Sequence, residues 1–336
     1  MVKNKLTLVM VIAVLAVLPL VTQTKAVLNA LILLLIFATL GEAWNIITGF
    51  AGQTSFGHAA FFGIGAYAAA VVFYRYDLSP WIGMLVGGIL SAIVAAIVSY
   101  PCFRLKGHYF AIATLAVAEI VSQIFVSWRY VEGATGISIP ILPRTASFGE
   151  RLLYLQFNDK VPWVYICLAL FAAVIFFCSY LENSRMGFYL KAIRESHEVA
   201  ESIGIDPTRY KLYAMIISAF ITALCGSLYA QYVLYIDPFM TFSLDISMKI
   251  VLLTVLGGIG NVFGPIIGAA IFIPLSEFTR IQLGGSGTGI DLMIYGFLIV
   301  LITCFQPKGV IGIVQQLADG LKQKDKGVEG HVEAAS

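Results

Sequence analysis

The chain has 336 residues, of which 59% are hydrophobic and 12% are charged, and its formal net charge is +2. Soluble domains carry about 25% charged residues, so this composition excludes an ordinary soluble fold. Its long continuous apolar runs also argue against an outer-membrane barrel, whose strands alternate apolar and polar residues. We therefore predict an all-α polytopic integral membrane protein. No basic run with interleaved aromatic residues indicates a nucleic-acid partner.

Apolar runs long enough to cross a bilayer recur along the chain. The first follows Lys3 and Lys5, as in a signal peptide, but no small-residue cleavage site comes after it, so we expect a retained helix. Glycines and Pro265 interrupt the stretch at 246–280, which is too long for one straight helix. It forms either two shortened helices, for about ten spans in all, or one bent or re-entrant unit, for about nine. Apart from 246–280, spans are predicted at 6–24, 26–47, 57–74, 81–103, 109–128, 161–181, 211–235 and 289–306.

Lysine and arginine are unevenly divided between the two sides of the predicted bundle. Most lie at the N-terminus, in the loop at 104–108, in a charged segment at 182–211 and in the tail at 316–336. The positive-inside rule then predicts that both termini and the charged segment are cytoplasmic. The transmembrane permease domain would span 1–315. The long loop at 129–160 would be external, either as an ordered cap or as a flexible connector.

The charged segment predicts an amphipathic helix over 187–203. Gly204 suits the left-handed position after a helix, and Pro207 is expected to keep the helix from resuming. Such a helix is either a docking surface for a soluble partner or a connector lying on the membrane. Its glutamates argue against a lipid-binding face. The apolar residues share one stripe at helical spacing: Tyr189, Ile193, Ala200 and Ile203.

The run EVAESIG at 198–204 resembles the EAA loop of ABC importer permeases, which inserts into a cleft of a cytoplasmic ATPase. His197 stands where that pattern leads us to expect an acidic residue. The resemblance implies an ATPase-coupling role for Arg194, Glu198, Ala200, Glu201 and Gly204.

Other segments narrow the resemblance: WNIITGFAGQTSFGHA at 44–59, RLKGHYFA at 104–111, VLGGIGN at 255–261 and QPKG at 306–309. Together they are similar to the LivM-type permease subunit of branched-chain amino-acid ABC importers. The resemblance implies a multi-pass protein of the bacterial inner membrane, surrounded by lipid. Its partners would be a LivH-type second permease subunit, two cytoplasmic ATPases that bind ATP and Mg²⁺, and a periplasmic amino-acid-binding protein.

Two apolar stretches are interrupted by glycine and polar residues, one at 48–58 and one at 257–265. Irregular backbone at membrane depth is tolerated where it is buried in protein or lines water. Paired breaks indicate a transport path at an internal repeat, although glycines such as Gly63 and Gly65 also permit close helix packing. Glu42 and Glu119, inside spans, are expected to face the bundle, as a polar lining or as structural hydrogen bonds. The candidate path residues are Asn45, Gln53, Ser55, His58, Glu119 and Asn261.

Several catalytic motifs are absent. The chain has no Gly-Lys pair for a phosphate-binding Walker A loop, no HExxH and no GxSxG. Its five cysteines form neither a metal pattern nor a disulfide framework. We predict no catalytic residue, no metal site and no cofactor bound by this chain. The alternatives are a urea or amide permease of the same family, and a secondary transporter that uses Glu119 as its ion site.

Overall fold

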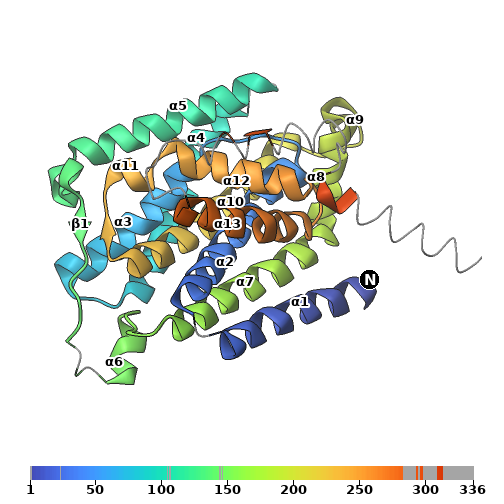
Figure 1. Ribbon diagram of the computed structural model, residues 1–336. Helices are drawn as coiled ribbons and strands as arrows, with labels where there is room; N and C mark the ends of the chain where they lie inside the picture. The colour runs from blue at the N-terminus through green and yellow to red at the C-terminus, as the bar shows by residue number, and fades with distance from the viewer. Residues whose placement is uncertain are drawn as a thin grey trace, which may run out of the picture.

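The computed structural model of the protein describes residues 2–22, 24–103, 105, 107–143, 145, 147–282, 293, 296–297 and 309–312. Within this part, long helices run side by side across the molecule (Figure 1). Seven helical stretches in it are long and apolar enough to cross a membrane. The fold is the all-α polytopic membrane protein that the composition predicts. The principal helices are α1 (Val2–Val21), α2 (Lys25–Asn45), α3 (His58–Tyr76), α4 (Pro80–Cys102), α5 (His108–Ser127), α7 (Lys160–Glu182), α10 (Pro207–Val233), α12 (Leu244–Gly257) and α13 (Gly264–Gln282).

Helix boundaries differ from the apolar runs mainly where polar residues start a helix. α1 and α10 both begin before the runs predicted at 6–24 and 211–235, because a helix can continue beyond its apolar part into polar surroundings. The expectation that Pro207 keeps a helix from resuming is wrong. Pro207 instead opens α10, at a position where its missing N–H costs nothing. Asp206 caps this start by accepting a hydrogen bond from Arg209 N at 3.1 Å. The predicted span at 289–306 and the tail at 316–336 lie outside the described residues.

The stretch at 246–280 forms two antiparallel helices, α12 and α13. A single bent helix is therefore wrong, whereas two spans and a re-entrant pair both have this form. The helices approach so closely that a Cβ on Gly268 would collide with Leu253 O, and one on Gly257 would collide with Gly264 O. The chain reverses in the glycine-rich turn at 258–263. Glycine permits this backbone contact, which is typical of helix packing in membranes.

The centre of the bundle is formed by α3, α4 and α10 packing against one another. A Cβ on Gly65 would collide with Ala223 O, and one on Gly226 would collide with Phe62 O, so the backbones of α3 and α10 touch from both sides. A Cβ on Gly63 would strike the Phe242 ring. Of the two readings of Gly63 and Gly65, the structure therefore supports close packing.

Helix α5 lies along one edge of the bundle and α1 along another (Figure 1). α5 packs through a single stripe consisting of Phe110, Thr114, Ala118 and Ser122. Residues beside this stripe, such as Val117 and Val121, are partly buried, and the opposite face is exposed in this chain, including Ile112, which is 65% exposed.

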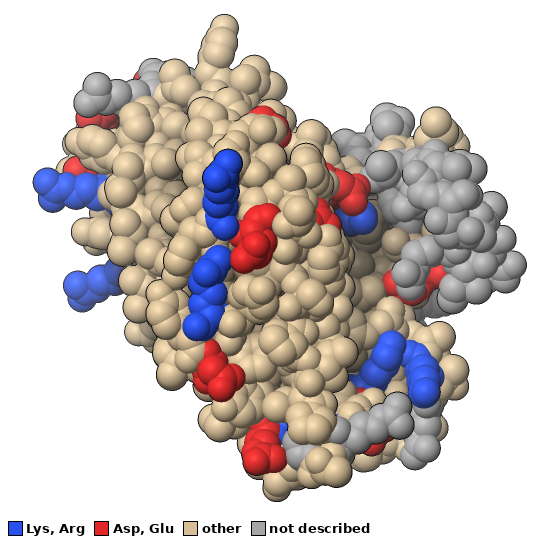
Figure 2. Space-filling view, turned by 90° about the vertical axis from the view of Figure 1, so that its left-hand side faces the viewer, with Lys and Arg blue, Asp and Glu red and all other residues tan. Residues whose placement is uncertain are grey.

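The end of the bundle opposite α8 and α9 carries a small ordered cover. Strand β1 (Ile137–Ser138) pairs antiparallel with β2 (Tyr235–Ile236), and the short helix α6 (Phe148–Leu153) begins with a capping box between Ser147 and Glu150. Charged side chains of both signs are spread over this end (Figure 2). The segment at 129–160 thus has defined structure where it is described, while the side of the membrane that it faces remains a prediction.

Candidate coupling site between two helix breaks

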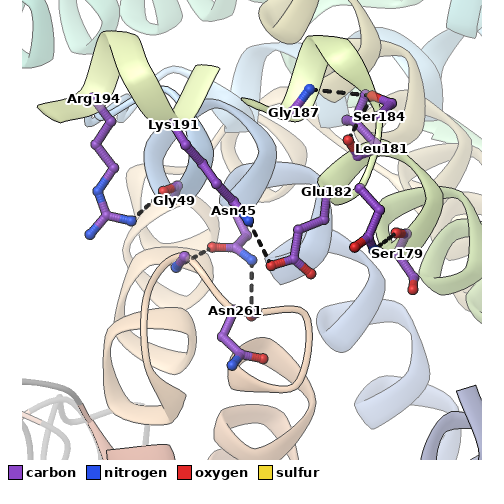
Figure 3. Close-up of polar contacts among 12 residues, drawn as sticks. Asn45, Gly49, Ser179, Leu181, Glu182, Ser184, Gly187, Lys191, Arg194 and Asn261 are labelled. Carbon is purple, nitrogen blue, oxygen red and sulfur yellow. Dashed lines mark hydrogen bonds and ion pairs between the residues drawn. The ribbon is translucent and has the colours of Figure 1, made fainter. Parts of the chain in front are cut away.

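Two interruptions of the helical backbone meet at the end of the bundle that carries α8 and α9. One is the π-helical turn η1 (Ile46–Phe50) after α2, and the other is the turn at 258–263. Asn45 joins them: its Nδ2 donates to Asn261 O at 3.1 Å, and its Oδ1 accepts from Gly260 N at 2.8 Å (Figure 3). Asn45 is fully buried, so these bonds hold one break against the other inside the protein.

The chain that leads from η1 to α3 is fixed by side-chain hydrogen bonds to its carbonyls. Thr48 Oγ1 donates to Gln53 O at 2.9 Å, and Trp44 Nε1 donates to Ser55 O at 2.7 Å. Ser55 Oγ accepts from Gly57 N at 3.3 Å. Protein groups therefore satisfy these backbone atoms, which is the condition under which irregular backbone is tolerated within a membrane protein.

His58 begins α3 and is completely buried. Its Nε2 lies 2.8 Å from Ser218 Oγ, and the Ser218 hydroxyl donates to Ala43 O at 2.6 Å. Because the serine proton is used in that second bond, we assign the donor of the first to His58 Nε2. The histidine thus connects α3 to α10 and, through Ser218, to α2.

Helix α8 (Arg185–Glu195) lies against η1 and is anchored to α7. Ser184 Oγ caps its first turn by accepting from Gly187 N at 3.3 Å. Lys191 Nζ lies 3.0 Å from Glu182 Oε1 and 5.9 Å from the centre of the Phe50 ring. These contacts hold α8 in position beside the first break.

Arg194, in the last turn of α8, reaches the two breaks. Its Nη1 donates to Gly49 O at 2.7 Å (Figure 3). A Cβ on Gly52 would lie 3.1 Å from Arg194 Cγ, and one on Gly260 would collide with Nη1. Gly52 and Gly260 thus leave room for this side chain between η1 and the turn at 258–263.

The predicted single helix over 187–203 is wrong, since the chain breaks at Ser196 and continues as α9 (His197–Ser202). Ser196 is extended, with φ −156°, and its Oγ accepts from Val199 N at 3.3 Å. A serine that caps a new helix competes with continuation of the old one. Ala200 is buried but Ile203 is 68% exposed, so the expected apolar stripe does not persist across the break.

Gly204 adopts the left-handed conformation that its position predicts, with φ +85°. Ile205 N donates to Ala200 O at 3.1 Å, which closes the end of α9 in a Schellman arrangement. Glu198 and Glu201 are exposed on α9.

Of the two glutamates inside spans, Glu42 faces the bundle as expected and Glu119 does not. Glu119 is exposed on α5, where Gln123 Nε2 donates to its Oε1 at 2.8 Å, so it does not face the bundle of this chain. The reason is that α5 packs through its opposite stripe. Glu42 is fully buried in α2, and within the described residues its carboxylate oxygens have no hydrogen-bond partner.

The structure therefore brings Asn45 and Asn261 together with Arg194 and leaves Glu119 apart. Sequence reasoning missed Lys191 with Glu182, because a nine-residue separation is not a helical spacing. It also missed Ser218, although a polar residue inside an apolar run is a signal that could have identified it. In the described part of the chain, no group of three or more His, Cys, Asp or Glu side chains could hold a metal ion.

Fold and site together define a polytopic α-helical membrane protein in which a polar segment is anchored on two broken helices. Residues 26–303 match the family described as "Branched-chain amino acid transport system / permease component", and the chain belongs to this family.

Relatives of two kinds are similar to this chain. The permease protein LivM of Escherichia coli is 28% identical, with 92% of this chain and 75% of that protein covered. The permease protein LivH of Salmonella typhimurium is 26% identical, with 82% of this chain and 91% of that protein covered. Among solved structures, a chain of PsaBC from Streptococcus pneumoniae gives a TM-score of 0.44 at 11% identity, covering 84% of this chain and 92% of that one. At that score the likeness supports no conclusion.

Proposed function

We propose that this chain is the LivM-type transmembrane subunit of an ATP-driven importer that moves branched-chain amino acids across the bacterial inner membrane. The family supports the substrate class, since LivM and LivH relatives are described as parts of branched-chain amino acid transport systems. The observation that carries the coupling part of the proposal is the contact of α8, through Arg194, with both helix breaks.

The partner at α8–α9 is proposed to be a cytoplasmic ATPase, two copies of which would supply the ATP-Mg chemistry. Val199 is 60% exposed and Ile203 is 68% exposed, on short polar helices that are not membrane spans. Glu198 and Glu201 surround them. An apolar centre with a charged rim is the composition of a protein docking surface rather than of a lipid-binding face.

A second permease subunit of the LivH type is proposed to cover α5. Glu119 and Gln123 are exposed on this apolar 20-residue helix. A carboxylate facing hydrocarbon costs on the order of 2.5–3.5 kcal/mol, so a protein neighbour stabilises it. Ile112 and Ala116 lie on the same face at helical spacing and would complete the contact.

The proposed mechanism is alternating access around the path between the two permease subunits. Both termini and α8–α9 would face the cytoplasm, as the distribution of basic residues indicates. The substrate-binding protein would then dock on the end covered by β1, β2 and α6. ATP-driven movement of the ATPases would shift α8–α9 and change the exposure of the path.

The test is reconstitution of the assembly purified with its natural partners in lipid vesicles, with radiolabelled leucine as the substrate. We expect two ATPase chains to copurify and leucine uptake to require ATP. Uptake that persists without ATP hydrolysis and collapses with an ion gradient would overturn the proposal in favour of a secondary transporter. Competition by urea or acetamide, but not by isoleucine or valine, would contradict the substrate class.

A further inference from the structure

The side chain of Arg194 bridges a partner-facing helix and the broken backbone of the bundle. The residue as a whole is exposed, yet its Nη1 donates to Gly49 O at 2.7 Å. Arg194 is therefore turned toward the membrane part of its own chain, although sequence motifs place it in the ATPase-coupling loop.

The carbonyl that receives this bond belongs to the π-helical turn, where the regular helical ladder is interrupted. A Cβ on Gly49 would lie 2.8 Å from Gly260 N, so the two breaks are in direct backbone contact. Asn45 binds Gly260 and Asn261 from the other side. A displacement of Gly49 O is therefore passed to the turn at 258–263 through contacts already in place.

Space for the guanidinium is provided from both breaks. Gly52 and Gly260 have positive φ, +72° and +83°, and each lacks a Cβ where Arg194 passes. The planar guanidinium donates hydrogen bonds in fixed directions at such a junction. A lysine ammonium is a point charge whose donors have no such fixed arrangement.

We propose that Arg194 is the transmission residue of this permease: it links movement of α8 to η1 and to the turn at 258–263 together. The proposal rests on the proposed function, since it requires an ATPase that moves α8–α9. Lys191 anchors α8 to α7 and sets its position, while Arg194 connects α8 to the backbone that must rearrange. Arg194 is a positioning residue and is not proposed to touch the transported molecule.

The experiment uses the complete assembly in lipid vesicles and measures leucine uptake and ATP hydrolysis in the same sample. Arg194→Gln removes the positive charge and the planar set of guanidinium N–H donors. We expect ATPase chains to remain bound and ATP hydrolysis to continue, while leucine taken up per ATP falls about 5-fold or more, within the range of typical couplings between sites. Arg194→Lys keeps the charge and is expected to give an intermediate ratio.

Arg209→Gln is the matched control. Arg209 lies at the start of α10, at the same end of the molecule, and is 76% exposed at its side chain beside Asp206. It should leave uptake per ATP close to the unmodified value.

A purely structural role would lower the amount of assembled complex without changing uptake per ATP, so that result would overturn the proposal. If Arg194→Gln fails to assemble, Arg194→Lys decides: an unchanged ratio would overturn transmission, and a lowered ratio would support it. If the unmodified assembly shows no ATP-driven uptake, the proposed function fails and the transmission role fails with it. If the unmodified assembly is coupled and Arg194→Gln is equally coupled, only the transmission role fails.

Discussion

Asn45 has a role that its residue type alone did not reveal. A polar side chain in an apolar span was expected to line a path, yet both ends of its amide are used to hold Gly260 and Asn261. Its position in the fold is therefore that of a clamp between two breaks, and its function in transport would be to keep them moving together.

Replacing Asn45 with Ala should destabilise the protein. The change leaves Gly260 N–H and Asn261 C=O without this partner, and an unsatisfied buried group costs about 1–3 kcal/mol. We expect the free energy of unfolding, measured in detergent by denaturant titration, to fall by about 2 kcal/mol.

Asn183→Ala is the control, because Asn183 also donates through Nδ2, to Ser179 O at 2.7 Å, but is exposed. It should cost about 0.5 kcal/mol or less, as surface changes generally do. Equal losses for the two variants would contradict the clamp.

At the scale of elements, α8 and α9 divide one polar segment into two parts with different contacts. α8 is held by Lys191 and Arg194, whereas α9 ends at Gly204 with its apolar residues outward. The break at Ser196 separates the anchored part from the exposed part, so a partner can bind α9 without replacing the anchor.

The double change Val199→Glu and Ile203→Glu should therefore weaken binding of the ATPases while the chain still inserts in the membrane. Two added carboxylates on an apolar docking surface must be desolvated when a partner binds, which costs more than the lost apolar contact. We expect several-fold less ATPase to copurify with the permease.

The control for this pair is Val199→Thr with Ile203→Thr, which shortens the apolar contact without adding charge. It should give an intermediate loss. Full ATPase recovery with the glutamate pair would show that α9 is not the docking element.

How much of this could be predicted from sequence depends on the range of the interaction. Spans such as α2 and α7 follow from apolar runs, and the left-handed Gly204 follows from local backbone preference. The break at Ser196 is also local, but a serine inside a helical pattern was outweighed by the apolar stripe. Arg194 meeting Gly49 joins residues 145 positions apart, and no local pattern specifies such a contact.

At the scale of the whole molecule, the chain leaves one helix incompletely covered. α5 presents Glu119 and Gln123 outward, which a stable membrane protein tolerates where another protein surface covers them. The exposed face of α5 is explained if a second permease subunit meets this chain there.

This arrangement predicts that α5 is protected when the assembly forms. A cysteine in place of Ile112, which is 65% exposed in this chain, should react with a membrane-permeable maleimide several-fold more slowly in the assembly than in the isolated subunit. Ile97→Cys on α4, where Ile97 is 68% exposed, is the matched control and should react at the same rate in both, because α4 would remain in lipid. The buried cysteines of the described residues, such as Cys167 and Cys178, should contribute little background.

Equal reaction of Ile112→Cys in the assembly and in the isolated subunit would place the second permease on another face. Glu119 would then have to be stabilised at the lipid boundary by Gln123 and water.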